Sequence, residues 1–399
     1  MKYDFDTPID RSGTDAIKLK RCPEIFGTEA VTPLWVADMD FATAPCIRDA
    51  IRRRLEHPIL GYTTLSDDFL ALTQDWIRSH HAWEPAIESI GFIPGIVPAL
   101  SFAVQCFSQQ GDQVIIQAPV YYPFFNVVRN NHRNLVLNPL KQEEGRFKMD
   151  LHHLENAITE RSRLLILCNP HNPGGRVWTR EELLALADVC RRHNLIVVSD
   201  EIHADMVLPS SPHPHTPFAS VSDWAAQHSV SFMAPSKVFN MPGLISSCYI
   251  IPNPALRRRF TSFLEASELG NGNLFAYIAT EAAYREGEEW RCQMLDYVQE
   301  NIHFVIDFLA REIPEIIPMN PEASFLIWLD CRNLGFSNTE ELFCFFIQKA
   351  GLGLNLGTIF GQGGEHHLRL NVASPRSILK EAMERLAQAV STRREGLAG

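Results

Sequence analysis

The chain has 399 residues, of which 46% are hydrophobic and 21% charged, and its formal net charge is −11. These values are typical of a globular protein with two or three domains. The acidic balance, with no long Lys/Arg block, argues against nucleic-acid binding. No apolar stretch approaches the roughly 18 residues of a membrane span. Nine scattered cysteines without a CxxC pair indicate reduced thiols, a cytoplasmic location and no metal or disulfide framework.

Short β-branched runs alternate with helical patterns through the middle of the chain. The runs expected to form buried strands are 114–116, 164–167, 195–198, 230–232 and 249–251. Between the second and third, Thr179 and Glu182 form a capping-box pattern that opens a helix. This order predicts an α/β fold with a mostly parallel central sheet flanked by helices. Ligands of such sheets bind beyond the carboxyl ends of the strands.

The pattern changes after about residue 285. A long helix at 288–312 is expected to precede a strand at 325–329, a helix at 340–349, a strand at 367–372 and a final helix at 377–392. We therefore predict three segments: an N-terminal arm (1–45), a large domain (46–285) and a smaller C-terminal α/β domain (286–399). The arm is expected to cover the small domain or a neighbouring subunit.

Lys237 stands in Ala-Pro-Ser-Lys, directly after the apolar run 230–233. Burying an unpaired ammonium is costly. An imine with an aldehyde cofactor would remove the fixed charge and make the lysine a catalyst. The alternative is a lysine on an exposed loop.

Two further features follow predicted strands on the N-terminal side of this lysine. Gly95, Ile96 and Val97 precede a helical pattern, and free N–H groups at a helix start could hold a phosphate. Tyr121 follows the strand at 114–116 and could stack on a flat heteroaromatic ring. A plain helix start and a core or rim aromatic are the alternatives.

Three polar features complete the pattern. The run 169–175, Asn-Pro-His-Asn-Pro-Gly-Gly, predicts a rigid turn. Asp200, at a buried strand end, needs a cationic partner, which a protonated pyridine nitrogen would supply, and His203 could contact the same ring. Arg369, inside a predicted strand, suits bidentate capture of a carboxylate, with a structural ion pair as the alternative. The histidines near 213–215 and 366–367 are interpreted as solvated, not as metal ligands.

In this order and spacing, the motifs Asn-Pro-x-Asn-Pro-x-Gly, Asp-Glu-x-His, Ser-Lys and Arg-Leu-Asn resemble the fold-type I pyridoxal-phosphate enzymes of the class I/II aminotransferase superfamily. The resemblance covers essentially the whole chain. Within the superfamily, segments 34–41, 61–63, 120–125 and 199–205 resemble the MalY/PatB branch, which contains cystathionine β-lyases and cystalysin.

The resemblance implies pyridoxal 5'-phosphate as cofactor and a homodimer with active sites at the subunit interface. It implies these cofactor contacts: Lys237 bonded to the aldehyde, Asp200 at the pyridinium nitrogen, Asn172 and His203 near the phenolic oxygen, Tyr121 on the ring face, and Gly95, Ile96, Val97, Ser236 and a neighbouring subunit's Tyr62 at the phosphate. For the substrate it implies Arg369 at the carboxylate, with Asn169, Ala37 and Tyr122 alongside.

Two positions depart from the aminotransferase pattern. Ile245 stands where aminotransferases commonly carry an arginine for the phosphate, and Ala234 stands where they often have serine. Loss of a charge-assisted contact costs about 1.5–3 kcal/mol if nothing replaces it. We therefore expect moderate cofactor affinity.

The activity implied is cleavage of a carbon–sulfur bond at Cβ of a sulfur amino acid, which yields a thiol, pyruvate and ammonia. Lys237 would be the base at Cα, and Tyr121 or Tyr62 could assist the leaving sulfur. Cystathionine, cysteine and cysteine conjugates share the same Cα and carboxylate, so the sequence does not choose between them. The alternatives are an aminotransferase, which Ile245 argues against, and a cofactor-binding regulatory protein.

Overall fold

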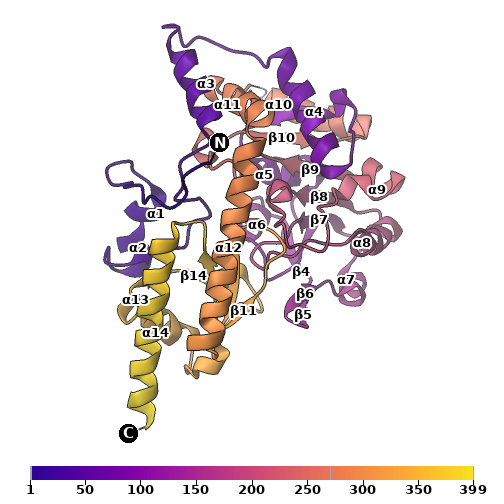
Figure 1. Ribbon diagram of the computed structural model, residues 1–399. Helices are drawn as coiled ribbons and strands as arrows, with labels where there is room; N and C mark the ends of the chain where they lie inside the picture. Colours follow the sequence, from indigo (N-terminus) through magenta and orange to yellow (C-terminus); the bar gives the residue numbers. More distant parts are fainter. Residues whose placement is uncertain (1, 270, 399) are drawn as a thin grey trace.

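The computed structural model describes residues 2–269 and 271–398. At its centre lies a seven-stranded sheet in the order β2–β10–β9–β8–β7–β3–β4 (Figure 1). The strands are β2 (Ile90–Ile93), β3 (Gln113–Ile116), β4 (Asn134–Leu137), β7 (Ser162–Cys168), β8 (Ile196–Asp200), β9 (Ser229–Met233) and β10 (Ser247–Ile250). Strands β4, β3, β7, β8 and β9 are parallel, and β10 is antiparallel to its neighbours β2 and β9. The predicted mostly parallel α/β sheet is confirmed.

Helices cover both faces of this sheet. One face packs against α5 (Ile96–Phe107), α6 (Pro123–Arg129) and α10 (Pro254–Ala266). The other packs against α7 (Leu151–Ala157), α8 (Arg180–Arg192) and α9 (Asp223–Gln227). Both faces are apolar: Val114 and Ile116 point into the first layer, and Ile115 points into the second. Continuous apolar runs such as 164–167 are what a sheet buried on both sides requires.

A second, antiparallel sheet has the order β11–β12–β15–β14. Its strands are β11 (Ile317–Met319), β12 (Leu326–Asp330), β14 (Asn355–Leu356) and β15 (His367–Asn371). The accompanying helices are α12 (Glu288–Glu312), α13 (Thr339–Gln348) and α14 (Arg376–Ala398), while α11 (Leu274–Glu286) packs against α3 (Pro45–Leu55) and α4 (Asp67–His81). In Figure 1, α12 and α14 run side by side along this part of the molecule.

The N-terminal segment packs on the part of the chain that carries the second sheet. It contains α1 (Ile17–Lys20), α2 (Cys22–Phe26) and β1 (Thr32–Pro33), and β1 pairs in parallel with β13 (Leu352–Gly353). Helices α3 and α4 follow, and the link between them projects at the top of Figure 1. A small hairpin joins β5 (Lys141–Glu143) to β6 (Arg146–Lys148).

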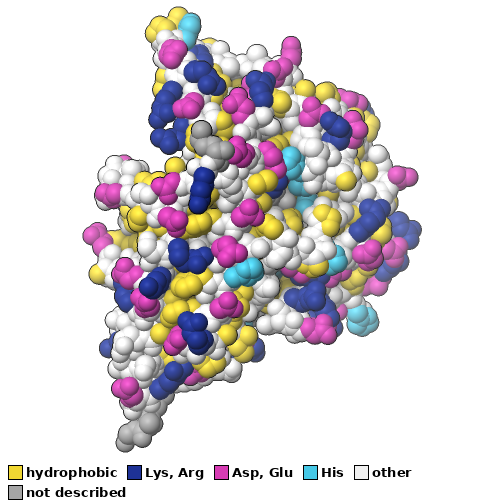
Figure 2. All heavy atoms as spheres, viewed as in Figure 1, with side chains coloured by type: hydrophobic (Ala, Val, Ile, Leu, Met, Phe, Trp, Pro, Cys, Tyr) yellow, Lys and Arg dark blue, Asp and Glu magenta, His cyan; other side chains and the backbone are white. Residues whose placement is uncertain are grey.

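Most predicted elements are present, and α12 has the predicted bounds. The final helix is longer than expected, and α3, α4 and the β5–β6 hairpin were not foreseen. The domain boundaries at 45 and 285 stay a prediction. No helix in the described residues is long and apolar enough to cross a membrane. Figure 2 shows basic and acidic side chains interspersed over one face of the molecule.

A buried arginine ties the loop after β7 to the segment before β12. Arg176 is 4% exposed and pairs with Glu182 at 2.8 Å and with Glu322 at 2.6 Å. Gly175 has a φ of +64° and accepts the N–H groups of Glu322 and Ala323. A Cβ on Gly175 would lie 2.4 Å from Pro321, so this close approach requires glycine. The rigid turn predicted at 169–175 thus couples the two sheets.

We expect Arg176→Leu to lower the free energy of unfolding by about 3 kcal/mol, because the variant removes the buried cation shared by two carboxylates and leaves Glu322 only the longer pair with Arg146 at 3.9 Å. Chemical denaturation at neutral pH measures the change. Arg78→Leu is the matched control, since Arg78 and Asp75 form an exposed pair one helical turn apart that contributes about 0.5 kcal/mol or less. Equal effects of the two substitutions would contradict this interpretation.

Candidate active site

The register of the parallel strands brings the predicted polar residues to one edge of the sheet. Cys168 is opposite Asp200 in the β7–β8 pair, and Asp200 is opposite Phe232 in the β8–β9 pair. The three strands therefore end at the same level, and the loops that follow them meet there. Asn172 lies four residues beyond β7 and Lys237 four residues beyond β9.

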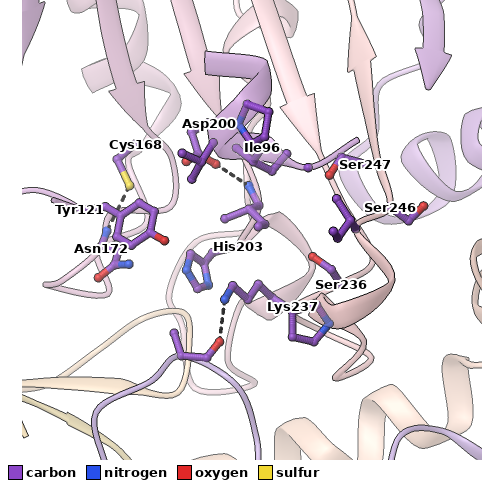
Figure 3. Close-up of a pocket in the computed structure, with 17 residues that line it drawn as sticks. Ile96, Tyr121, Cys168, Asn172, Asp200, His203, Ser236, Lys237, Ser246 and Ser247 are labelled. Atoms are coloured by element: carbon purple, nitrogen blue, oxygen red, sulfur yellow. Dashed lines mark hydrogen bonds between the residues drawn. The ribbon is translucent and has the colours of Figure 1, made fainter. Parts of the chain in front are cut away.

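An inner cavity of about 200 Å³ opens at this edge. In Figure 3, Tyr121 and Asn172 lie on one side of it, Ser236, Ser246 and Ser247 lie on the other, and Asp200, His203 and Lys237 lie between them. The remaining lining residues are Ala37, Gly95, Ile96, Val97, Pro98, Cys168, Ile202, Pro242 and Ile245.

Lys237 extends into this cavity from the turn after β9. Its Nζ donates a hydrogen bond to the carbonyl oxygen of Ala37 at 2.6 Å. Burial lowers the pKa of Lys237 to about 8, and the positive charge of Arg369 adds to the decrease. A neutral, nucleophilic amine is therefore accessible near physiological pH. The alternative of a lysine on an exposed loop is wrong, because the side chain is half-buried and lines the cavity.

Asp200 is 3% exposed and ends β8. Its Oδ1 accepts the N–H of Ile202 at 3.1 Å, and the side chain forms no ion pair with any described residue. Burial raises the pKa of Asp200 to about 7, against the opposing effect of the Ile202 hydrogen bond. A carboxyl group in this state accepts a cationic partner readily, because the partner's charge restores its ionised form.

His203 and Asn172 present polar atoms beside Asp200. The Nδ1 atom of His203 is buried and has no hydrogen-bond partner, and burial lowers the pKa of His203 to about 3. The imidazole is therefore neutral and free to bond a ligand. Asn172 is positioned by its N–H, which donates to the sulfur of Cys168 at 3.3 Å, and by its Oδ1, which accepts from Arg369 at 3.0 Å.

The other end of the cavity is built to receive an anion. Helix α5 begins there without a side-chain cap, so the first N–H groups of the helix, at Ile96 and Val97, are available. Gly95, with a φ of +86°, lets the chain turn into the helix. Ser236 and Ser247 add hydroxyls to the lining. Ile245 stands nearby with an apolar side chain, so hydroxyls and backbone dipoles replace the arginine of the aminotransferase pattern.

Arg369 is the buried cation of β15, 2% exposed. Its Nη2 donates to the carbonyl oxygen of Trp35 at 2.9 Å and to Asn355 Oδ1 at 2.5 Å. The guanidinium lies 4.9 Å from the centre of the Phe360 ring. Burial lowers the pKa of Arg369 to about 10. No carboxylate among the described residues pairs with it, so the structural ion pair weighed as an alternative is wrong.

Besides Arg369, three predicted site residues lie outside the lining of the inner cavity. Asn169 is fully buried and donates through Nδ2 to the carbonyl oxygen of Thr216 at 3.0 Å, which makes it a brace of the loop. Tyr122 is 37% exposed and lines a second cavity. Tyr62 is fully exposed on the link between α3 and α4. Its expected contribution from a neighbouring subunit stays a prediction.

Several lining residues have no clear signal in the sequence. Ser247 is the first residue of β10, the strand that runs antiparallel to both of its neighbours. Cys168 is the last residue of β7. Cys168 is expected from its apolar surroundings to be a core residue, yet it also orients Asn172. Asn355, a partner of Arg369, comes from a two-residue strand that is too short for periodicity to reveal. Only the spacing of Ser246 and Ser247 after Lys237 could have pointed to them.

Comparisons with known proteins agree with this architecture. The family model "Aminotransferase class I and II" matches residues 29–386. Cystathionine beta-lyase PatB of Bacillus subtilis (strain 168) is 43% identical over 388 residues, covering 97% of this chain and 100% of PatB. Protein MalY of Escherichia coli (strain K12) is 32% identical over 393 residues, covering 97% and 99%. The chain therefore belongs to the class I and II aminotransferase family.

Among solved structures, cystalysin from Treponema denticola, which contains a pyridoxal 5'-phosphate cofactor, matches with a TM-score of 0.94 and 34% sequence identity. The match covers 98% of this chain and 100% of cystalysin. The expected fold type I is thus confirmed.

The inner cavity fits pyridoxal phosphate on its own chemistry. Lys237, whose lowered pKa makes the neutral amine accessible, can react with the aldehyde. Asp200, which has no ion-pair partner, can pair with a pyridinium nitrogen. The Nδ1 atom of His203, which has no hydrogen-bond partner, can bond a ring substituent. The uncapped start of α5 suits the phosphate. Tyr121, which lines the cavity beside Asn172, offers a ring face.

We expect covalent capture of pyridoxal phosphate by the cofactor-free protein to accelerate with rising pH up to about 8 and then level off. The reason is that the neutral fraction of Lys237 grows until pH passes its lowered pKa. Stopped-flow absorbance measures the rate, and Nα-acetyl-lysine under the same conditions corrects for titration of the cofactor. A rate still rising at pH 10 would show that Lys237 is an ordinary lysine.

We expect Ser236→Ala to raise the Kd of pyridoxal phosphate about five- to tenfold, because one phosphate hydroxyl contact is lost. Titration of the cofactor-free protein measures the change. Ser246→Ala is the matched control: the Ser246 hydroxyl bonds to Thr280 at 2.7 Å and points away from the cavity in Figure 3. A larger loss of affinity in the control would place the anion elsewhere.

Proposed function

We propose that this protein is a pyridoxal-phosphate-dependent carbon–sulfur β-lyase that acts on L-cystathionine, L-cysteine or related cysteine S-conjugates. The conjugate and one water yield a thiol, pyruvate and ammonia. The observation that carries the proposal is the placement of Lys237 and Asp200 in the lining of the inner cavity, with Arg369 bonded at 3.0 Å to Asn172 of the same lining. None of the three charged groups has an ion-pair partner among the described residues. Two similar proteins support the proposal: PatB is named a cystathionine beta-lyase, and the cystalysin structure contains pyridoxal 5'-phosphate.

Bound pyridoxal phosphate supplies an electron sink for the charge that develops at Cα of the substrate. Asp200 holds a proton at the ring nitrogen, which keeps that sink strong. Arg369 binds the α-carboxylate and can exchange its neutral carbonyl contacts for a charged one. Asn172 bridges the two ends of the site, because its Oδ1 bonds Arg369 while its side chain lines the inner cavity.

Lys237 is the base that takes the proton from Cα. With a pKa lowered to about 8, its free amine accepts a proton without binding it too tightly to return it. Tyr121 lines the same cavity, and burial raises its pKa, so it keeps its proton and can donate a hydrogen bond to the departing sulfur. The bond between Cβ and sulfur then breaks, and sulfur leaves with the electron pair.

We further propose that two subunits complete each site. A groove of about 940 Å³ adjoins the inner cavity and shares Lys237, Ala37, Pro242 and Ile245 with it. On the link between α3 and α4, Ile59, Leu60 and Tyr62 are exposed, and apolar side chains displayed together in this way mark an interface.

The unpaired cysteines fit a reducing compartment such as the cytoplasm.

We expect the purified protein, loaded with pyridoxal phosphate, to release pyruvate from L-cystathionine without any added 2-oxo acid. Lys237→Ala is expected to lose at least a thousandfold in kcat, since both the covalent anchor and the base disappear. A lactate-dehydrogenase-coupled assay follows the pyruvate. Turnover that requires a 2-oxo acid would indicate an aminotransferase instead, and normal turnover by Lys237→Ala would overturn the scheme.

A further inference from the structure

An outer cavity of about 580 Å³ adjoins the substrate side of the site. Trp35 and Asn355 line it, and both accept hydrogen bonds from Nη2 of Arg369. Its lining also includes Arg21, Tyr122, Phe125, Asn126, Arg129 and Thr358. The guanidinium of Arg369 is thus directly bonded to two residues of the outer cavity wall, to the carbonyl oxygen of Trp35 and the side chain of Asn355.

Two consecutive tyrosines also connect the cavities. Tyr121 lines the inner cavity and Tyr122 the outer one, and their ring centres are 5.2 Å apart. A substrate whose carboxylate is at Arg369 would carry its sulfur substituent past these rings. The outer cavity is therefore within reach of the part of the substrate that leaves as a thiol.

The charged residues that line the outer cavity are all basic. Arg21 and Arg129 line it, and no aspartate or glutamate does. Arg21 is already paired with Glu24 at 2.5 Å. Arg129 is exposed at the end of α6 and forms no ion pair with any described residue. Its guanidinium lies 5.7 Å from the centre of the Phe125 ring, which holds the charge at the cavity wall.

We propose that the outer cavity binds an anionic group at the far end of the sulfur substituent, with Arg129 as the cation that recognises it. This inference rests on the proposed β-lyase function and narrows it to cysteine conjugates whose leaving thiol carries an anionic group that reaches Arg129. Tyr122, Asn126 and Thr358 supply polar atoms around the same space. Arg129 acts on specificity only, because it touches neither the cofactor cavity nor the reacting bond.

The test compares two substrates that differ only in charge. S-(3-carboxypropyl)-L-cysteine and its neutral amide, S-(3-carbamoylpropyl)-L-cysteine, have the same length and shape. We expect the wild-type enzyme to prefer the carboxylate about tenfold in kcat/KM, and Arg129→Gln to abolish that preference through KM while leaving the amide unchanged. Arg191→Gln is the control, since Arg191 is an exposed arginine paired with Asp188 on α8.

A charge-reversal variant tests the same point in the opposite direction. Arg129→Glu is expected to favour S-(4-aminobutyl)-L-cysteine, which ends in a cation, over the carboxylate. Equal loss on the carboxylate and the amide in Arg129→Gln, or an unchanged preference, would overturn the assignment of Arg129 while the β-lyase function stands. No pyruvate from any conjugate with wild-type enzyme would overturn the proposed function, and the substrate class with it.

Discussion

Buried charge without a partner is the constraint on which this structure depends. Arg369 is surrounded by neutral oxygens and an aromatic ring, and Asp200 by a backbone N–H, while Lys237 bonds only a carbonyl oxygen. Leaving such groups unpaired costs several kcal/mol each, and the lowered or raised pKa of each group records that cost. The fold keeps the three groups from neutralising one another, so that each can meet the complementary charge of a ligand.

Keeping Asp200 and His203 in place requires a stiff loop, and a buried layer behind that loop provides it. Glu201 accepts from His215 at 2.9 Å and from the N–H of Phe218 at 3.1 Å. His215 and His367 are each 4% exposed, so the interpretation of these two histidines as solvated is wrong. Asp205 accepts from both His81 and Trp76 at 2.9 Å. Hydrogen bonds of Glu201 and Asp205 thus hold the six-residue segment from Asp200 to Asp205, while Nδ1 of His203 keeps no hydrogen-bond partner. Because every partner of these two carboxylates comes from elsewhere in the chain, the loop cannot relax towards the unpaired charges it displays.

The sequence predicted the parts of the site that lie at strand ends. Asp200, Asn172 and Lys237 follow strands that apolar runs mark clearly, and parallel strands bring their carboxyl ends to one edge. It could not predict that Asn169 turns away to bond Thr216, or that Asn355 meets Arg369. Those outcomes depend on side-chain direction and on contacts between segments far apart in the chain. The strand β10 was predicted at 249–251, but its antiparallel direction was not, because a short apolar run carries no direction.

The same reasoning explains why the family is easier to recognise than the substrate. Every cysteine conjugate presents one amine, one α-carboxylate and one Cα, so the residues that handle them, Lys237 and Arg369 among them, recur at recognisable spacing. What distinguishes one conjugate from another begins beyond the sulfur. There the outer cavity is lined by Tyr122, just before α6, by Arg129 at the end of α6, and by Thr358 in the short 3-10 helix after β14. These residues share no motif. They meet because the 3-10 helix after β14 (Gly357–Phe360) lies against the loop after β3, where the N–H of Val120 donates to the carbonyl oxygen of Phe360 at 2.9 Å. Selectivity for the leaving thiol is therefore a property of the packing between the two sheets.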